Sequence, residues 1–200
     1  MWAAPSTRLE MSTDRFRVSR DTPALFVTAV AKDRLPVFRT APIKALTCRA
    51  VDQARQSCGF LLLAYVVMPD HLHLVTDNRH PASEVLRFVK GIIAHDVVEH
   101  LKNEGYETSL QKLRHEEGKR RHRHSLWGHE SNVVSVFSES VLMQKVNYVH
   151  LNPVRAGLVE RAVDYRWSSV RCWMNCPSPT EPLAVDVDRI EWRRSASGGA

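Results

Sequence analysis

Two histidines separated by one residue are the first feature of the sequence that could do chemistry. His71 and His73 lie in the segment HLHLVT, where polar and apolar residues alternate as in a β-strand with one accessible face. Residues two apart in a strand point to the same side, so both imidazoles should project together. Neutral imidazoles bind divalent metal ions, and a pair needs at least one further ligand. The alternative is two surface histidines, since ten histidines make this spacing easy to find by chance.

A tyrosine and an asparagine form the second candidate, in the segment YVHLNPVRAG. Tyr148 and Asn152 are four residues apart, which places a phenol and an amide on one face if the segment is helical. Pro153 disfavours helical geometry in the residue before it, so the helix is predicted to end near His150. The alternative is an amphipathic tyrosine that packs at a helix end, followed by an Asn-Pro stop.

The basic residues suggest a polyanionic partner. Between Lys112 and His124, six lysines and arginines face only two glutamates, a composition that could follow a phosphate backbone. Most such runs are solvated loops, which is the alternative here. The candidate DNA contacts in this run are Lys119, Arg120, Arg121 and Arg123. Arg15 and Arg17, in a basic N-terminal arm, could grip DNA in the same way.

The composition excludes several classes of protein. The chain has 200 residues, 44% of them hydrophobic and 25% charged, which argues against wholesale disorder. No apolar run approaches the roughly 20 residues that span a bilayer, and residues 1–20 lack the apolar block of a secretory signal. Four cysteines do not make a disulfide scaffold, so we expect a cytoplasmic protein with no membrane partner. The net charge of +6 favours, without requiring, a nucleic-acid partner.

The order of the predicted elements defines a fold class. Strands are predicted at 24–30, 61–67, 71–76 and 132–137, and helices at 41–57, 81–102 and 139–150. This order is the α+β, ferredoxin-like βαββαβ arrangement, an antiparallel sheet with two helices on one face, followed by an additional C-terminal helix that carries the tyrosine. Residues 1–22 are expected to form the arm, 23–173 one domain, and 174–200 a Pro-rich tail that begins where the compact region ends.

Three blocks of sequence follow one another in a fixed order. They are AYVVMPDHLHLV (Ala64 to Val75), YVHLNPVRAGLV (Tyr148 to Val159) and DYRWSS (Asp164 to Ser169). Together the blocks resemble the single-tyrosine HUH transposases and, within them, the REP-associated tyrosine transposases. The resemblance covers roughly residues 15–173. It implies the same ferredoxin-like fold that the element order predicts.

The resemblance also implies a mechanism and a role for each motif residue. His71 and His73 would hold Mg²⁺ or Mn²⁺, with Asn152 as a candidate third ligand, and Tyr148 would attack a phosphate of single-stranded DNA near a REP-like hairpin. The products would be a 5′-phosphotyrosine and a free 3′-OH. Arg155, in the same block as the tyrosine, would contact DNA. Related insertion-sequence transposases usually carry glutamine where this chain has the shorter asparagine.

Other functions fit the same residues. The chain could be a domesticated, catalytically silent protein that binds single-stranded DNA or hairpins, or an unrelated metallohydrolase in which the tyrosine has no role. The leading hypothesis is a metal-dependent DNA endonuclease and strand transferase of the bacterial cytoplasm, associated with the nucleoid, acting as a monomer or a homodimer.

Overall fold

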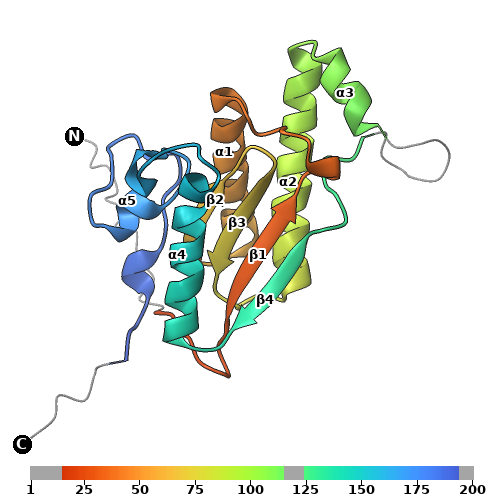
Figure 1. The fold of residues 1–200 in the computed structure, drawn as a ribbon. Coiled ribbons are helices and arrows are strands. Elements are labelled where there is room, and N and C mark those ends of the chain that lie inside the picture. Colours follow the sequence, from red (N-terminus) through yellow and green to blue (C-terminus); the bar gives the residue numbers. More distant parts are fainter. Residues whose placement is uncertain (1–14, 115–123, 194–200) are drawn as a thin grey trace, which may run out of the picture.

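A four-stranded antiparallel sheet forms the centre of the molecule (Figure 1). The computed structural model describes residues 15–114 and 124–193. The strands are β1 (Ala24–Val30), β2 (Leu62–Val67), β3 (His71–Thr76) and β4 (Asn132–Val136). They are arranged in the order β2-β3-β1-β4, and every neighbouring pair is antiparallel. This is the strand order of a ferredoxin-like βαββαβ unit, so the predicted α+β fold is confirmed.

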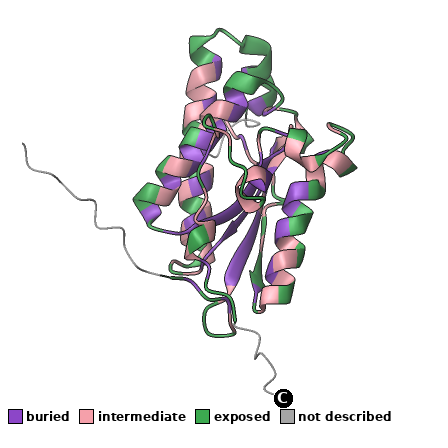
Figure 2. Ribbon diagram, turned by 90° about the vertical axis from the view of Figure 1, so that its left-hand side faces the viewer, coloured by how far each residue is buried: buried purple, intermediate pink, exposed green. Residues whose placement is uncertain are grey.

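The helices form a layer on each side of the sheet. On one side, α1 (Ala41–Cys58) packs against α2 (Ala82–Asn103), and on the other side α4 (Glu139–Arg155) lies over β2 and β3 (Figure 1). The shorter helices are α3 (Glu107–Leu113), α5 (Val170–Trp173), η1 (Lys32–Arg34), η2 (Ala162–Asp164) and η3 (Val187–Arg189). Strands β1, β2 and β3 are largely buried between the layers, whereas β4 is largely exposed, and the long helices are buried on one side only (Figure 2).

Alternate residues of the strands enter two separate apolar clusters. Leu25 and Val27 of β1 join the cluster beneath α1 and α2, whereas Phe26 joins the cluster beneath α4. In β3, Leu72 and Leu74 likewise face α1 and α2. The period-2 geometry of a strand therefore turns the intervening histidines toward α4.

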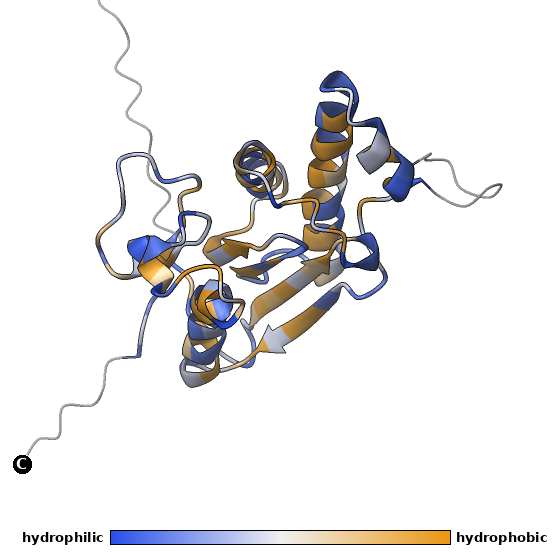
Figure 3. Cartoon of the chain, turned by 45° about the horizontal axis from the view of Figure 1, so that its top comes forward, coloured by the Kyte–Doolittle hydropathy of each residue, from blue (hydrophilic) through white to orange (hydrophobic). Residues whose placement is uncertain are grey.

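The helix boundaries have local causes. Pro42 lies in the first turn of α1, where its missing N–H leaves no helical bond unmade, and Gly59 ends the helix in the left-handed region with φ of 86°. The hydroxyl of Ser138 accepts a hydrogen bond from the Val141 backbone N–H and caps α4. The long helices have an apolar side and a polar side (Figure 3). No helix in the described ranges is long and apolar enough to cross a membrane.

The prediction that α4 ends near His150 is wrong. The helix continues through Pro153 to Arg155, and Asn152 is therefore helical. Pro153 is buried, and hydrogen bonds from Ala156 to Asn152 and from Leu158 to Pro153 continue beyond the proline. A proline removes one helical hydrogen bond. Packing of the last turn against the domain outweighs that local preference.

A short helix also occupies part of the polar region that followed the second predicted helix. Helix α3 buries only Leu110 and Leu113, both against the α1–α2 cluster. Two apolar residues are too few to produce a recognisable helical period. Packing against the α1–α2 cluster therefore stabilises a helix that sequence periodicity alone does not predict.

The segment after α4 covers the free edge of β2. Backbone hydrogen bonds join Val67 to Trp167, Ser169 to Tyr65, and Asp186 to Leu62. The Asp186 carboxylate also accepts from the Leu62 N–H at 2.9 Å. An edge strand exposes unpaired backbone groups that invite association, and this segment removes that exposure.

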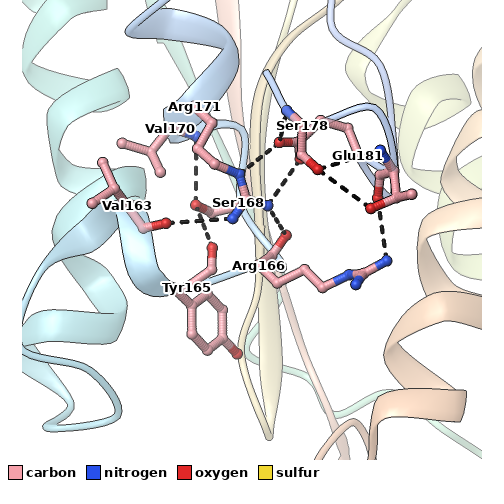
Figure 4. A network of polar contacts seen from close by, with 9 residues as sticks. Val163, Tyr165, Arg166, Ser168, Val170, Arg171, Ser178 and Glu181 are labelled. Atoms are coloured by element: carbon pink, nitrogen blue, oxygen red, sulfur yellow. Dashed lines mark hydrogen bonds and ion pairs between the residues drawn. The ribbon is translucent and has the colours of Figure 1, made fainter. Parts of the chain in front are cut away.

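The Pro-rich stretch does not end the packed region, contrary to the expectation from its composition. Leu183 and Ile190 are buried in the two apolar clusters. Glu181 accepts two hydrogen bonds from the Arg171 guanidinium, at 2.6 and 3.1 Å, and one from the Ser178 backbone N–H (Figure 4). Proline limits regular structure but does not prevent this segment from packing. The domain boundaries at residues 22 and 173 themselves stay a prediction.

His150 should make folding sensitive to mild acid. It is buried in α4, it hydrogen-bonds Ser169 through Nε2 at 2.9 Å, and burial lowers its pKa from 6.5 to about 4. The unfolded chain binds this proton more readily, so the stabilisation is complete above pH 6.5 and is lost as the pH falls toward 4, by about 3 kcal/mol. Urea unfolding at pH 7 and pH 4 should show a smaller loss of stability in His150→Gln than in wild type. The exposed control His129→Gln should behave as wild type, and an equal loss in all three proteins would contradict the assignment.

Candidate active site

Strand β3 presents its two histidines side by side on the face covered by α4. The register of β1 and β3 pairs Thr28 with His73 and Val30 with His71. The imidazole centroids are 4.8 Å apart, with an angle of 74° between the rings. His71 is partly exposed, whereas His73 is buried. The structure thus brings together the two residues that the sequence singled out as metal ligands.

Each imidazole is oriented through its Nδ1 atom. His71 Nδ1 lies 2.6 Å from Asp70 Oδ1, and His73 Nδ1 lies 2.9 Å from the Thr28 hydroxyl. These contacts leave Nε2 of each ring as the atom available to a shared ligand. Metal-binding histidines commonly use the second nitrogen in this way, because it fixes the tautomer and the direction of the ring.

A cation in turn holds Asp70. The Arg34 guanidinium lies 3.2 Å from Asp70 Oδ2 and 3.1 Å from Glu130. Arg34 has a positive φ of 50°, a conformation in which a residue other than glycine or asparagine is uncommon. Asp70, Arg34 and Thr28 were not among the site residues predicted from the sequence. The contact of Asp70 with His71 could have been predicted, because the two residues are adjacent in the sequence. The contact of Thr28 with His73 could not, because it depends on the register of two strands.

His73 is suited to bind a metal ion in its neutral form. Its pKa is lowered to about 3, first by burial and then by the neighbouring His71, while Asp70 acts in the opposite direction and Lys145 lowers it further. A histidine ligand must be deprotonated at the coordinating nitrogen. At neutral pH this ring meets that requirement before any metal arrives.

Helix α4 places Tyr148 against His73, the buried member of the histidine pair. The Tyr148 ring centroid is 5.3 Å from that of His73, and Phe26 contacts both rings at 5.2 Å from His73 and 5.8 Å from Tyr148. The tyrosine nevertheless remains 40% exposed. A phenol in this position touches an imidazole and is open to a large substrate.

Two cations flank the tyrosine on α4. The Arg155 guanidinium carbon lies 5.3 Å from the centroid of the Tyr148 ring, and Lys145 Nζ lies 4.7 Å from that of Phe26. Lys145, Tyr148, Asn152 and Arg155 are spaced by three, four and three residues, so they form one stripe along the helix. This spacing could have identified Lys145, which the sequence analysis missed.

Asn152 makes its described hydrogen bond within its own helix. Its side-chain Nδ2 donates to the Tyr148 carbonyl at 3.1 Å. This contact turns the amide nitrogen toward the backbone and leaves Oδ1 as the atom that could reach a metal ion. Its role as third ligand stays a prediction.

The other predicted DNA contacts have different outcomes. Arg15 and Arg17 are exposed on either side of Phe16, which is buried in the same cluster as Phe26. The described end of the arm is therefore anchored on the α4 side of the sheet. The remaining candidates, Lys119, Arg120, Arg121 and Arg123, lie outside the described residues.

The fold is shared with the solved structure of a transposase. A REP-associated tyrosine transposase bound to a REP hairpin aligns with 89% of this chain and 92% of its own, with a TM-score of 0.56 and 18% sequence identity. A Deinococcus radiodurans protein, provisionally described as a transposase, aligns with 64% of this chain and 88% of its own, with a TM-score of 0.44 and 20% identity. No protein-family model and no curated protein matches the sequence. The resemblance stated from the three sequence blocks is thus confirmed at the level of the fold.

Asp70 should strengthen metal binding by orienting His71. Asp70→Asn removes the carboxylate charge while keeping the size of the side chain, so the affinity for Mn²⁺ should fall about 10- to 100-fold. Titration calorimetry of the purified chain with Mn²⁺ measures this. The control Asp188→Asn changes an exposed aspartate in η3 and should leave the affinity unchanged. Equal affinities in all three proteins would show that the Asp70 contact has no orienting role.

Proposed function

We propose that this chain is a metal-dependent endonuclease and strand transferase that acts on single-stranded DNA beside a hairpin. The observation that supports this most directly is the convergence of Tyr148 from α4 with His71 and His73 from β3. A ferredoxin-like fold alone would support many functions. The tyrosine and histidine geometry is what favours nucleophilic attack on a phosphate.

The donor set fits a divalent cation with an incomplete protein shell. His71 and His73 would supply two nitrogen ligands and Asn152 an amide oxygen, while phosphate and water oxygens would complete a shell suited to Mg²⁺ or Mn²⁺. When bound, the ion would polarise and orient the scissile phosphate. The orienting contacts from Asp70 and Thr28 would hold the imidazoles ready for it.

Tyr148 would act as the nucleophile. Its phenol oxygen forms a bond to phosphorus, the bond from phosphorus to the 3′ oxygen breaks, and the 3′ oxygen leaves as a hydroxyl after taking a proton. The phenol proton passes to solvent, to which the 40% exposed ring has access. The resulting 5′-phosphotyrosine conserves the energy of the phosphodiester. Attack by another 3′-OH can therefore rejoin strands without ATP.

The surrounding cations would hold the DNA backbone. Arg155 and Lys145 border the tyrosine, and Arg15 and Arg17 extend from the same side of the sheet. We propose that the basic residues Lys119, Arg120, Arg121 and Arg123 add to this surface. The REP hairpin bound to the similar transposase structure suggests the class of DNA to test.

Replacement of Tyr148 should abolish covalent attachment to DNA. Wild-type protein incubated with labelled single-stranded hairpin DNA and Mn²⁺ should yield an adduct that survives a denaturing gel, and chelation should prevent it. Tyr148→Phe removes only the hydroxyl and should reduce the adduct at least 1,000-fold, on the order of the losses seen when a catalytic nucleophile is removed. Tyr106→Phe is the matched control, since Tyr106 is similarly exposed but lies beside α3.

Two results would contradict the proposal and favour a different function. Hairpin binding by the wild-type chain without any adduct, over a range of metal ions and hairpins, would indicate a catalytically silent DNA-binding protein. Metal-dependent cleavage that persists in Tyr148→Phe would indicate a metallohydrolase that does not use the tyrosine.

Arg155 should contribute a phosphate contact. Arg155→Gln should weaken hairpin binding and reduce the slope of log affinity against log salt by about 1, because one fewer counterion is released. Fluorescence anisotropy at several salt concentrations measures both. Arg49→Gln, on the exposed side of α1, is the control and should leave the slope unchanged. An unaltered slope in Arg155→Gln would exclude the contact.

A further inference from the structure

A second group of metal-ligating side chains lies on the other side of the sheet. Cys58 is the last residue of α1, His80 lies in the loop after β3, and Glu84 is in the first turn of α2. One ligand atom from each lies within 4.8 Å of the other two. His71 and His73, by contrast, are at the opposite end of β3 and face α4. The two groups are therefore separate.

The backbone around this group makes room for the imidazole. Gly59 ends α1 with φ of 86°, and a Cβ atom built there would lie 3.3 Å from His80 Nε2. A larger residue would crowd the ring as well as strain the backbone. On the other side of the ring, His80 Nδ1 lies 3.5 Å from Glu84 Oε2. The glycine thus lets His80 lie between the ends of the two helices.

The electrostatics of the group favour a cation. Burial raises the pKa of the Cys58 thiol, and the charges of Glu84 and Asp77 raise it further, while Arg87 acts in the opposite direction. A dication would replace the thiol proton and relieve the repulsion between thiolate and carboxylate. Arg87 contacts Glu84 at 3.5 Å, but its side chain is 71% exposed, so this ion pair is weak and can be displaced.

We propose that Cys58, His80 and Glu84 form a Zn²⁺ site that joins the end of α1 to the start of α2. Sulfur, imidazole nitrogen and carboxylate oxygen are the three ligand types that zinc takes, and a thiolate favours zinc over Mg²⁺. Binding forms a bond from zinc to Sγ and releases the thiol proton to solvent. The fourth tetrahedral position is open to a water molecule.

The geometry requires only local adjustment. Bond lengths of about 2.0–2.3 Å to zinc place tetrahedral ligand atoms roughly 3.3–3.6 Å apart, so separations within 4.8 Å need to shorten by at most about 1.5 Å. His80 and Glu84 have side chains that are 35% and 37% exposed, and both can change rotamer. Cys58 is held by the core and sets the position of the ion.

Cobalt binding tests the proposal on the full-length chain. Reduced, metal-depleted protein is titrated with Co²⁺, and the near-ultraviolet charge-transfer absorption that only a cobalt–thiolate bond produces is recorded. We expect the band to saturate at one Co²⁺ per chain, to disappear on addition of one equivalent of Zn²⁺, and to be absent in Cys58→Ser. The control Cys176→Ser alters an exposed thiol outside the group and should keep the band.

Further variants separate this site from the proposed active site. The double variant His71→Ala, His73→Ala should keep the cobalt–thiolate band, whereas His80→Gln and Glu84→Gln should each weaken cobalt binding at least tenfold. These two also test the site if Cys58→Ser fails to fold. Absence of the band in the wild-type chain, or a band that survives Cys58→Ser, would overturn the zinc proposal. Neither result would decide whether Tyr148 forms a DNA adduct, because the two proposals are tested by separate experiments.

Discussion

The antiparallel pairing of β1 with β3 is the constraint on which the candidate active site depends. This register sets Thr28 beside His73 and brings Phe26 into contact with the same imidazole. A shift of one residue would turn the histidines into the apolar layer beneath α1 and α2, where an unpaired imidazole is costly to bury. Leu72 and Leu74, which alternate with the histidines along β3, oppose that shift because they fill the layer themselves. Packing on one face thus holds the polar groups on the other.

Helix α4 combines packing and chemistry through its own periodicity. Leu142, Val146 and Val149 are buried against the sheet, while the adjoining stripe carries Tyr148 and Arg155. The buried face of α4 therefore fixes the backbone position of the tyrosine relative to the sheet. The segment after α4 closes the free edge of β2 and adds a second layer of support through Glu181 and Asp186. The Tyr148 ring nevertheless remains 40% exposed.

The two groups of metal-ligating residues differ in the chemistry they favour. The pair on β3 offers two nitrogen ligands beside the exposed ring of Tyr148, where, in the proposed function, oxygen atoms of DNA and water would complete the shell. The group at the ends of α1 and α2 offers a buried sulfur and two side chains close to it. A thiolate among these ligands favours zinc over Mg²⁺. The sheet separates the two groups.

The sequence alone was sufficient for features that depend on local periodicity. The range of β1 follows from its β-branched and aromatic composition, and the range of β3 with the shared face of His71 and His73 follows from alternation. The helical setting of Tyr148 follows from helical spacing. Tertiary structure decided whatever depends on contacts between distant segments. Register brought Thr28 to His73, and packing carried α4 through Pro153 and drew the Pro-rich segment onto β2. The approach of Cys58 to His80 and Glu84 is of the same kind, since sequence spacing determines which way a side chain faces on its own element but not which distant element it meets.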